Sequence, residues 1–100
     1  MQNETAEQMI KRKRTYALRE KVIADVCESA AMKDELAHPE VWGKLTREDG
    51  QKRIDMIYAR CSEAIADDVS TNNAAWCDIS YSSMMDRALM ICENAMRQVS

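Results

Sequence analysis

The stretch TREDGQKRIDMIYARCSEAIADD, residues 46–68, carries the clearest structural pattern in the chain. Thr46 is a natural N-cap, and the acidic residues that follow it suit the positive end of a helix dipole. Apolar side chains then recur at intervals of three and four residues, which places them on one face of a helix. The segment therefore predicts an amphipathic helix that ends near Asp67 or Asp68, because acids at a C-terminus oppose the dipole. Its apolar face consists of Ile54, Ile57, Tyr58, Cys61, Ala64 and Ile65.

Two further segments have helical periodicity. The first covers about residues 4–32, with Thr5 as its predicted N-cap. The second covers residues 83–98, where Ser83 and Asp86 resemble a capping box. Both segments present an apolar stripe, as expected of helices that share one core. The stripes are Met9, Tyr16, Val22, Ile23, Val26, Cys27 and Ala30 in the first, and Met85, Ala88, Leu89, Cys92, Ala95, Met96 and Val99 in the second.

The connections are short. The residue before a proline avoids the helical region, so His38 marks a break. Pro39 suits the first turn of a new helix, and residues 39–44 therefore predict a short helical segment. Residues 69–73, VSTNN, predict a loop.

Residues 74–82 fit two structures. Cys77, Ile79 and Tyr81 alternate with polar residues, as in a strand, but they also fit a helix that starts at Asn73. A strand needs a partner, and the chain contains no second convincing strand. We therefore predict a helix with a break near residues 82–83. A short strand near residues 77–81 remains an alternative only if another copy of the chain pairs with it.

Composition agrees with a helical domain. The 100 residues are 46% apolar and 31% charged, which allows one core and no second domain. Two glycines and one proline are too few for the many turns of a β-sandwich or barrel. We predict a single all-α domain over residues 1–100, an antiparallel bundle of three main helices plus one short helix. Residues 1–8 are polar enough to fray, and no internal repeat is apparent.

Residues for catalysis, metals or cofactors are not grouped in the sequence. Glycine occurs only at Gly43 and Gly50, which excludes a glycine-rich phosphate loop. His38, the only histidine, lies in a turn and has no nearby cysteine. The four cysteines form no C-x-x-C pair, so we expect thiols in the core of a cytoplasmic protein rather than a metal site. No apolar run is long enough to span a membrane.

The last helix carries more apolar side chains than one buried face requires. Met84 and Met90, together with Ile91, widen its apolar surface. One interpretation is that this helix lies centrally and is covered on two sides. The other is that these residues form an interface with Trp76 and Trp42, because flexible methionines adapt to varied partners and tryptophans anchor interfaces.

Charge is unevenly distributed. Residues 1–21 hold six cations and three acids, a net charge of +3, whereas the other 79 residues hold eight cations and fourteen acids, a net charge of −6. Successive residues of a helix point about 100° apart, so four consecutive cations do not form one patch. The basic segment suits a solvated surface, an acidic protein surface or nucleic-acid phosphates. It contains Lys11, Arg12, Lys13, Arg14, Arg19 and Lys21.

We therefore expect a non-catalytic protein–protein interaction module: a small cytosolic regulator, adaptor or inhibitor that binds another protein and also forms a homo-oligomer. Its small size and lack of motifs are typical of accessory proteins of phages and other mobile elements. One alternative is a nucleic-acid-associated protein that uses residues 11–21. Another is an acidic mimic of nucleic acid that blocks a basic groove on a host enzyme with Asp49, Asp55, Glu63, Asp67 and Asp68.

Overall fold

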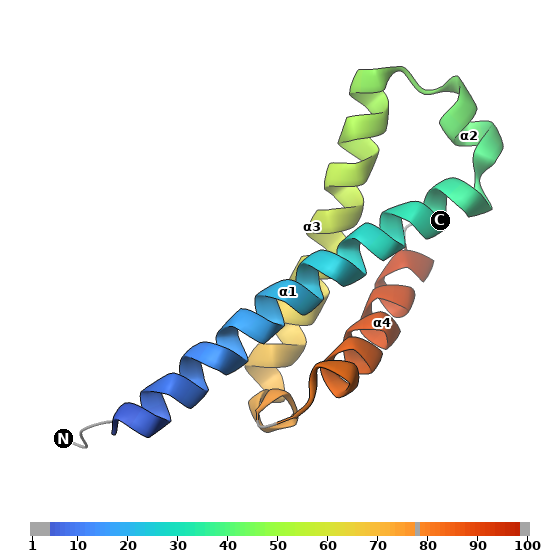
Figure 1. The fold of residues 1–100 in the computed structure, drawn as a ribbon. Helices are drawn as coiled ribbons and strands as arrows, with labels where there is room; N and C mark the ends of the chain where they lie inside the picture. The colour runs from blue at the N-terminus through green and yellow to red at the C-terminus, as the bar shows by residue number, and fades with distance from the viewer. Residues whose placement is uncertain (1–4, 78, 99–100) are drawn as a thin grey trace.

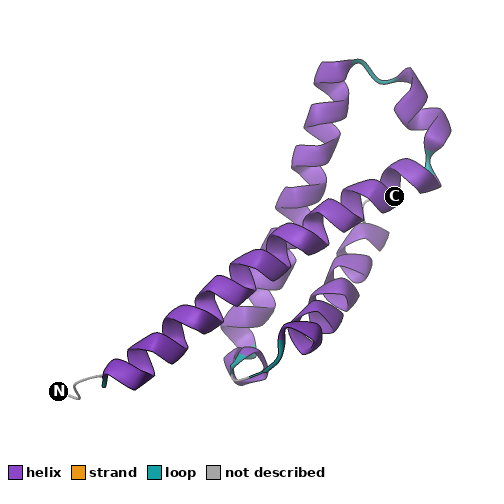
Figure 2. Cartoon of the chain, viewed as in Figure 1, coloured by secondary structure: helices purple, strands orange, loops and turns teal. Residues whose placement is uncertain are grey.

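The computed structural model describes residues 5–77 and 79–98, which form helices and loops without a strand (Figure 2). Three long helices, α1 (Ala6–Ala37), α3 (Arg47–Thr71) and α4 (Tyr81–Arg97), pack against one another in all three pairings (Figure 1). The short helix α2 (Pro39–Lys44) joins α1 to α3, and the 3-10 helix η1 (Asn73–Trp76) joins α3 to α4. The predicted all-α bundle of three main helices and one short helix is confirmed.

The core forms where the apolar stripes of the three long helices meet. Each helix contributes side chains three or four residues apart, which removes apolar surface from water along the shared axis. Trp76 of η1 closes one end of this core and is 0% exposed. The other buried apolar side chains are Val22, Val26 and Cys27 of α1, Ile57, Cys61 and Ile65 of α3, and Met84, Ala88 and Cys92 of α4.

The starts of the first two long helices are as predicted. Thr5 caps α1, and its hydroxyl and backbone N–H form reciprocal hydrogen bonds with Gln8. Thr46 caps α3 by accepting a hydrogen bond from the N–H of Asp49. The short helix has the predicted bounds, with Pro39 in its first turn. The predicted start at Glu4 and the apolar Val99 lie outside the described residues.

Helices α1 and α3 run further than predicted, to Ala37 and Thr71. The predicted end of α3 at Asp67 or Asp68 is wrong because the carboxylate of Asp68 has charged and hydrogen-bonding partners. It pairs with Arg87 of α4 and accepts a hydrogen bond from Trp76. These partners offset the repulsion between an acid and the negative end of the helix dipole.

The break before α4 also differs from the prediction. After η1, the chain leaves the helical conformation at Cys77 and resumes it at Tyr81, not near residues 82–83. Ser80, rather than Ser83, caps α4 by accepting a hydrogen bond from the N–H of Ser83. No strand is present in the described part of residues 77–81, which excludes residue 78.

The N-terminal turns of α1 extend past the rest of the bundle (Figure 1). Every residue from 5 to 14 is exposed, and the first buried residue of the helix is Val22. Met9 and Tyr16, predicted on the core stripe, are 39% and 60% exposed. That prediction is wrong because periodicity identifies a helix face but does not show whether another element lies opposite it. Residues 6–17 are called the arm below.

Candidate functional site

Two turns join the long helices: the first corner, between α1 and α3, and the second corner, between α3 and α4. Both corners are built from the same residue types at the same spacing. In the first corner, Asp34 accepts hydrogen bonds from the indole N–H of Trp42 at 2.9 Å and from Nε of Arg53 at 2.5 Å. In the second corner, Asp68 accepts the equivalent bonds from Trp76 and Arg87, both at 2.7 Å. In both corners the tryptophan follows the aspartate by 8 residues and the arginine follows it by 19.

The backbone of the two corners repeats as well. His38 and Asn72 end α1 and α3 with φ, ψ of −129°, 56° and −126°, 49°. Their N–H groups donate to the carbonyl oxygens of Asp34 and Asp68. Thr46 and Ser80 then cap the following helices. The prediction of no internal repeat is therefore wrong, because one helix–corner–helix unit occurs twice.

The electrostatics of the corners suit a structural role. The Arg53 guanidinium lowers the pKa of Asp34, against the opposing effect of burial. The pKa of Asp68 is lowered to about 2, most strongly by Arg87 and further by hydrogen bonds from Trp76 and Asn72. Both carboxylates are thus ionised and already paired. Five acids are predicted to mimic nucleic acid. Of these, Asp68 is already paired with Arg87, whereas the other four are exposed: Asp49, Asp55, Glu63 and Asp67.

Three of the four thiols lie in the core, one from each long helix. Cys61 forms hydrogen bonds with Cys27 and Cys92; these contacts and burial raise the pKa values of Cys27 and Cys92, whereas the same contacts lower the pKa of Cys61 against the opposing effect of burial. Cys77 is exposed, which corrects the expectation that all four thiols are buried. It follows η1 in an extended conformation, and its thiol donates to the side-chain oxygen of Asn73 at 3.0 Å. Within the described ranges, no three His, Cys, Asp or Glu side chains form a metal site.

The five residues of the predicted interface do not share one surface. Trp76 and Met84 are buried in the core. Trp42 is half-buried in the first corner, and Ile91 is half-buried on α4. Of the five, only Met90 is exposed, at 64%.

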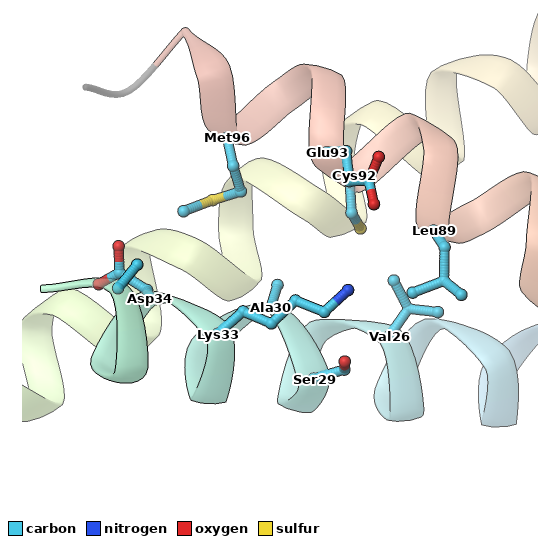
Figure 3. A pocket seen from close by; sticks show the side chains of 10 residues that line it. Val26, Ser29, Ala30, Lys33, Asp34, Leu89, Cys92, Glu93 and Met96 are labelled. Atoms are coloured by element: carbon cyan, nitrogen blue, oxygen red, sulfur yellow. The ribbon is translucent and has the colours of Figure 1, made fainter.

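A cavity of about 190 Å³ lies between α1 and α4 near the C-terminal ends of both helices. Leu89 and Cys92 point into it from α4, opposite Val26 and Ala30 of α1 (Figure 3). The lining is mostly apolar, with charged side chains such as Lys33 at its edge. The cavity is therefore suited to an apolar group rather than to acid–base chemistry.

The six cations of the predicted basic segment lie on α1, and three of them meet in a cleft. The cleft has a volume of about 440 Å³ and lies between the arm and the end of the bundle at η1. Lys21 lies elsewhere, with its amine 5.3 Å from the centre of the Tyr81 ring. Lys13 lines a second hollow beside Tyr16. The residues that line the basic cleft are Gln8, Lys11, Arg12, Thr15, Arg19, Asn73 and Cys77.

Comparison of the chain with protein-family models, with curated proteins and with solved structures gave no match. Among the described helices, none is both long and apolar enough to cross a membrane. The structure itself offers the arm and the basic cleft beside it as the candidate site, because the arm is exposed and three cations line the cleft.

Proposed function

We propose that this chain is a non-catalytic protein-interaction module, a small regulator, adaptor or inhibitor, whose main contact element is the arm. The observation that carries the proposal is that α1 continues for about three turns beyond the helices it packs against. The rest of the fold does not require these turns, because the shared core begins at Val22.

The arm has the properties of a helix segment that packs against a partner. Most of the stability of a protein helix comes from tertiary packing, so an unpacked extension gains stability when another surface covers it. Met9, Ile10 and Tyr16 expose 39%, 50% and 60% of their surfaces along it. Burying an apolar side chain of this size contributes about 1.5–3 kcal/mol when complete.

Nucleic acid is the second candidate because residues 6–21 hold six cations and two acids, a net charge of +4. The other described residues oppose it. They hold eight cations and thirteen acids, a net charge of −5, which would repel a nucleic-acid backbone lying along the bundle. Binding to phosphates would also weaken steeply as salt rises.

Affinity capture with matched variants tests the proposal. Met9→Ser/Ile10→Ser/Tyr16→Ser removes the apolar surface of the arm. Met32→Ser/Leu36→Ser, at positions 58% and 79% exposed near the other end of α1, is the control. We expect the control to retain the protein partners of the wild type and the arm variant to lose them, with both variants folded by circular dichroism. Partners that persist with the arm variant, or that disappear after nuclease treatment, would contradict the proposal.

A further inference from the structure

The core-facing stripe of α1 changes character where the bundle ends. Val26 and Val22 are buried in the core. Continuing toward the N-terminus at intervals of three and four residues, the same face carries Arg19, then Thr15 and Arg12, which line the basic cleft. This part of α1 thus presents cations and a hydroxyl in the direction where the bundled part of the helix presents valines.

The cleft has a second wall. Asn73 and Cys77, at the η1 end of the bundle, line it opposite the arm. Three lining residues are cationic and the described residues lining it include no acid, so its electrostatic potential is positive. The cleft is open to solvent, because five of its seven lining residues are exposed.

We infer that this basic cleft binds an acidic segment of the partner protein, with carboxylates against Lys11 and Arg19. The inference rests on the proposed function and names the chemistry of the partner. Arginine presents a planar fork of donors that matches a carboxylate, and lysine adds a mobile point charge. The exposed Met9 and Tyr16 of the arm, which lie beside the cleft-lining face of the helix, would contact apolar side chains that flank the acidic segment.

A short protein segment fits the charge distribution better than a nucleic acid. Duplex DNA carries about one negative charge per 1.7 Å of its axis, so its charge continues past any short site. Beyond the arm, such a polymer would meet the bundle, whose described residues carry a net charge of −5. An acidic protein segment can end where the cleft ends and avoid that repulsion.

Cys77 supplies a direct reporter because it lines the cleft and is the exposed thiol, whereas Cys27, Cys61 and Cys92 are buried. We would measure binding of fluorescein-labelled deca-glutamate by anisotropy and alkylation of Cys77 by neutral N-ethylmaleimide with the unlabelled peptide. With the peptide at about ten times its Kd, mass action leaves about a tenth of the cleft free, so alkylation should slow about tenfold.

Lys11→Glu/Arg19→Glu should abolish both binding and protection. The control Lys52→Glu/Arg60→Glu makes the same change in net charge on exposed α3 residues and should preserve both. Absence of peptide binding, or binding that leaves Cys77 unprotected, would overturn the inference. Tighter binding and equal protection by a ten-nucleotide oligothymidine would overturn the choice of a protein segment.

Partner capture separates failure of this inference from failure of the proposed function. If Lys11→Glu/Arg19→Glu retains the captured partner while Met9→Ser/Ile10→Ser/Tyr16→Ser loses it, the arm binds a partner but the cleft does not. Loss of the partner with both variants, and with neither control, is the result we expect.

Discussion

Asp34 and Asp68 each accept hydrogen bonds from a tryptophan that follows in the connecting helix and from an arginine in the next long helix. One carboxylate thus fixes three elements at each turn. The two corners differ in burial, because Trp76 is 0% exposed whereas Trp42 is only half-buried. The two tryptophans should therefore contribute different amounts to the free energy of unfolding.

Truncating the two tryptophans tests this difference. Trp76→Ala should lower the free energy of unfolding by about 3–5 kcal/mol, the usual cost of removing a large aromatic side chain from a core. Trp42→Ala should cost about half as much because less of its surface leaves water on folding. Urea unfolding followed by circular dichroism measures both values. Equal losses would show that the corners do not differ in this way.

The pH dependence of stability reports on the second corner. The pKa of Asp68 is about 2 in the folded protein, against an ordinary value of 3.8, because Arg87 stabilises the carboxylate. A group with a lowered folded pKa stabilises the protein above its unfolded value, and this contribution is lost as pH falls from about 4 to about 2. Asp68→Asn should be less stable than the wild type near neutral pH, and the difference should shrink through that interval.

The matched control for this titration is Asp67→Asn, which changes an exposed carboxylate one residue away. It removes the same charge without removing the Asp68–Arg87 pair, so the effect of Asp68→Asn is measured against it. A constant difference between Asp68→Asn and the wild type from neutral pH to about pH 2 would contradict the role of the Asp68–Arg87 pair.

At the scale of the elements, local signals predicted most of the fold. N-caps at Thr5 and Thr46 and the break before Pro39 depend on a few adjacent residues, so they can be read from sequence. The end of α3 and the start of α4 depend on the second corner, whose arginine lies 19 residues from its aspartate. Tertiary pairing of this kind is invisible to a local pattern.

The repeat did leave a signal that periodicity does not detect. Shifting the sequence by 34 residues superposes Cys27 on Cys61 and the whole first corner on the second. Self-comparison of the sequence would have identified Asp34 and Asp68 as a structural pair. The basic cleft could not be predicted in the same way, because it depends on where α3 and η1 stop opposite α1. The matching pairs are Asp34 and Asp68, Trp42 and Trp76, and Arg53 and Arg87.

Gly50 offers a test of the packing of α3 against Trp42 of α2. It lies inside the helix, and a Cβ atom added there would meet Cζ3 of Trp42 at 3.8 Å, an ordinary contact distance. Gly50→Ala should therefore raise the free energy of unfolding by about 1 kcal/mol through the better helix propensity of alanine. Thermal unfolding checks the prediction, and a lower midpoint would mean that Trp42 packs more tightly against α3 than described.

At the scale of the whole molecule, the bundle is elongated and electrically polarised. Its principal extents are 56 × 23 × 22 Å and its radius of gyration is 16.3 Å, whereas a compact domain of this length has about 13 Å. The arm accounts for part of this elongation (Figure 1) and holds four cations and one acid, a net charge of +3. One end of the molecule is thus cationic and unpacked, while the rest is packed and acidic.

Thiol accessibility tests whether the three-helix core is closed. In the native protein, N-ethylmaleimide should modify Cys77 rapidly, and Cys27, Cys61 and Cys92 only when the bundle opens. Mass spectrometry over a time course distinguishes the sites. Simultaneous modification of Cys77 and Cys92 would indicate that the cavity between α1 and α4 admits the reagent without unfolding.

Hydrogen exchange of the chain, alone and in complex with its captured partner, tests the central claim most directly. In the free protein, we expect fast exchange in the arm and strong protection of the α3 core around Cys61, because only the latter is covered by other helices. In the complex, the arm should gain the most protection. Protection gained instead around Met90 of α4 or Leu36 of α1, with the arm unchanged, would contradict the account.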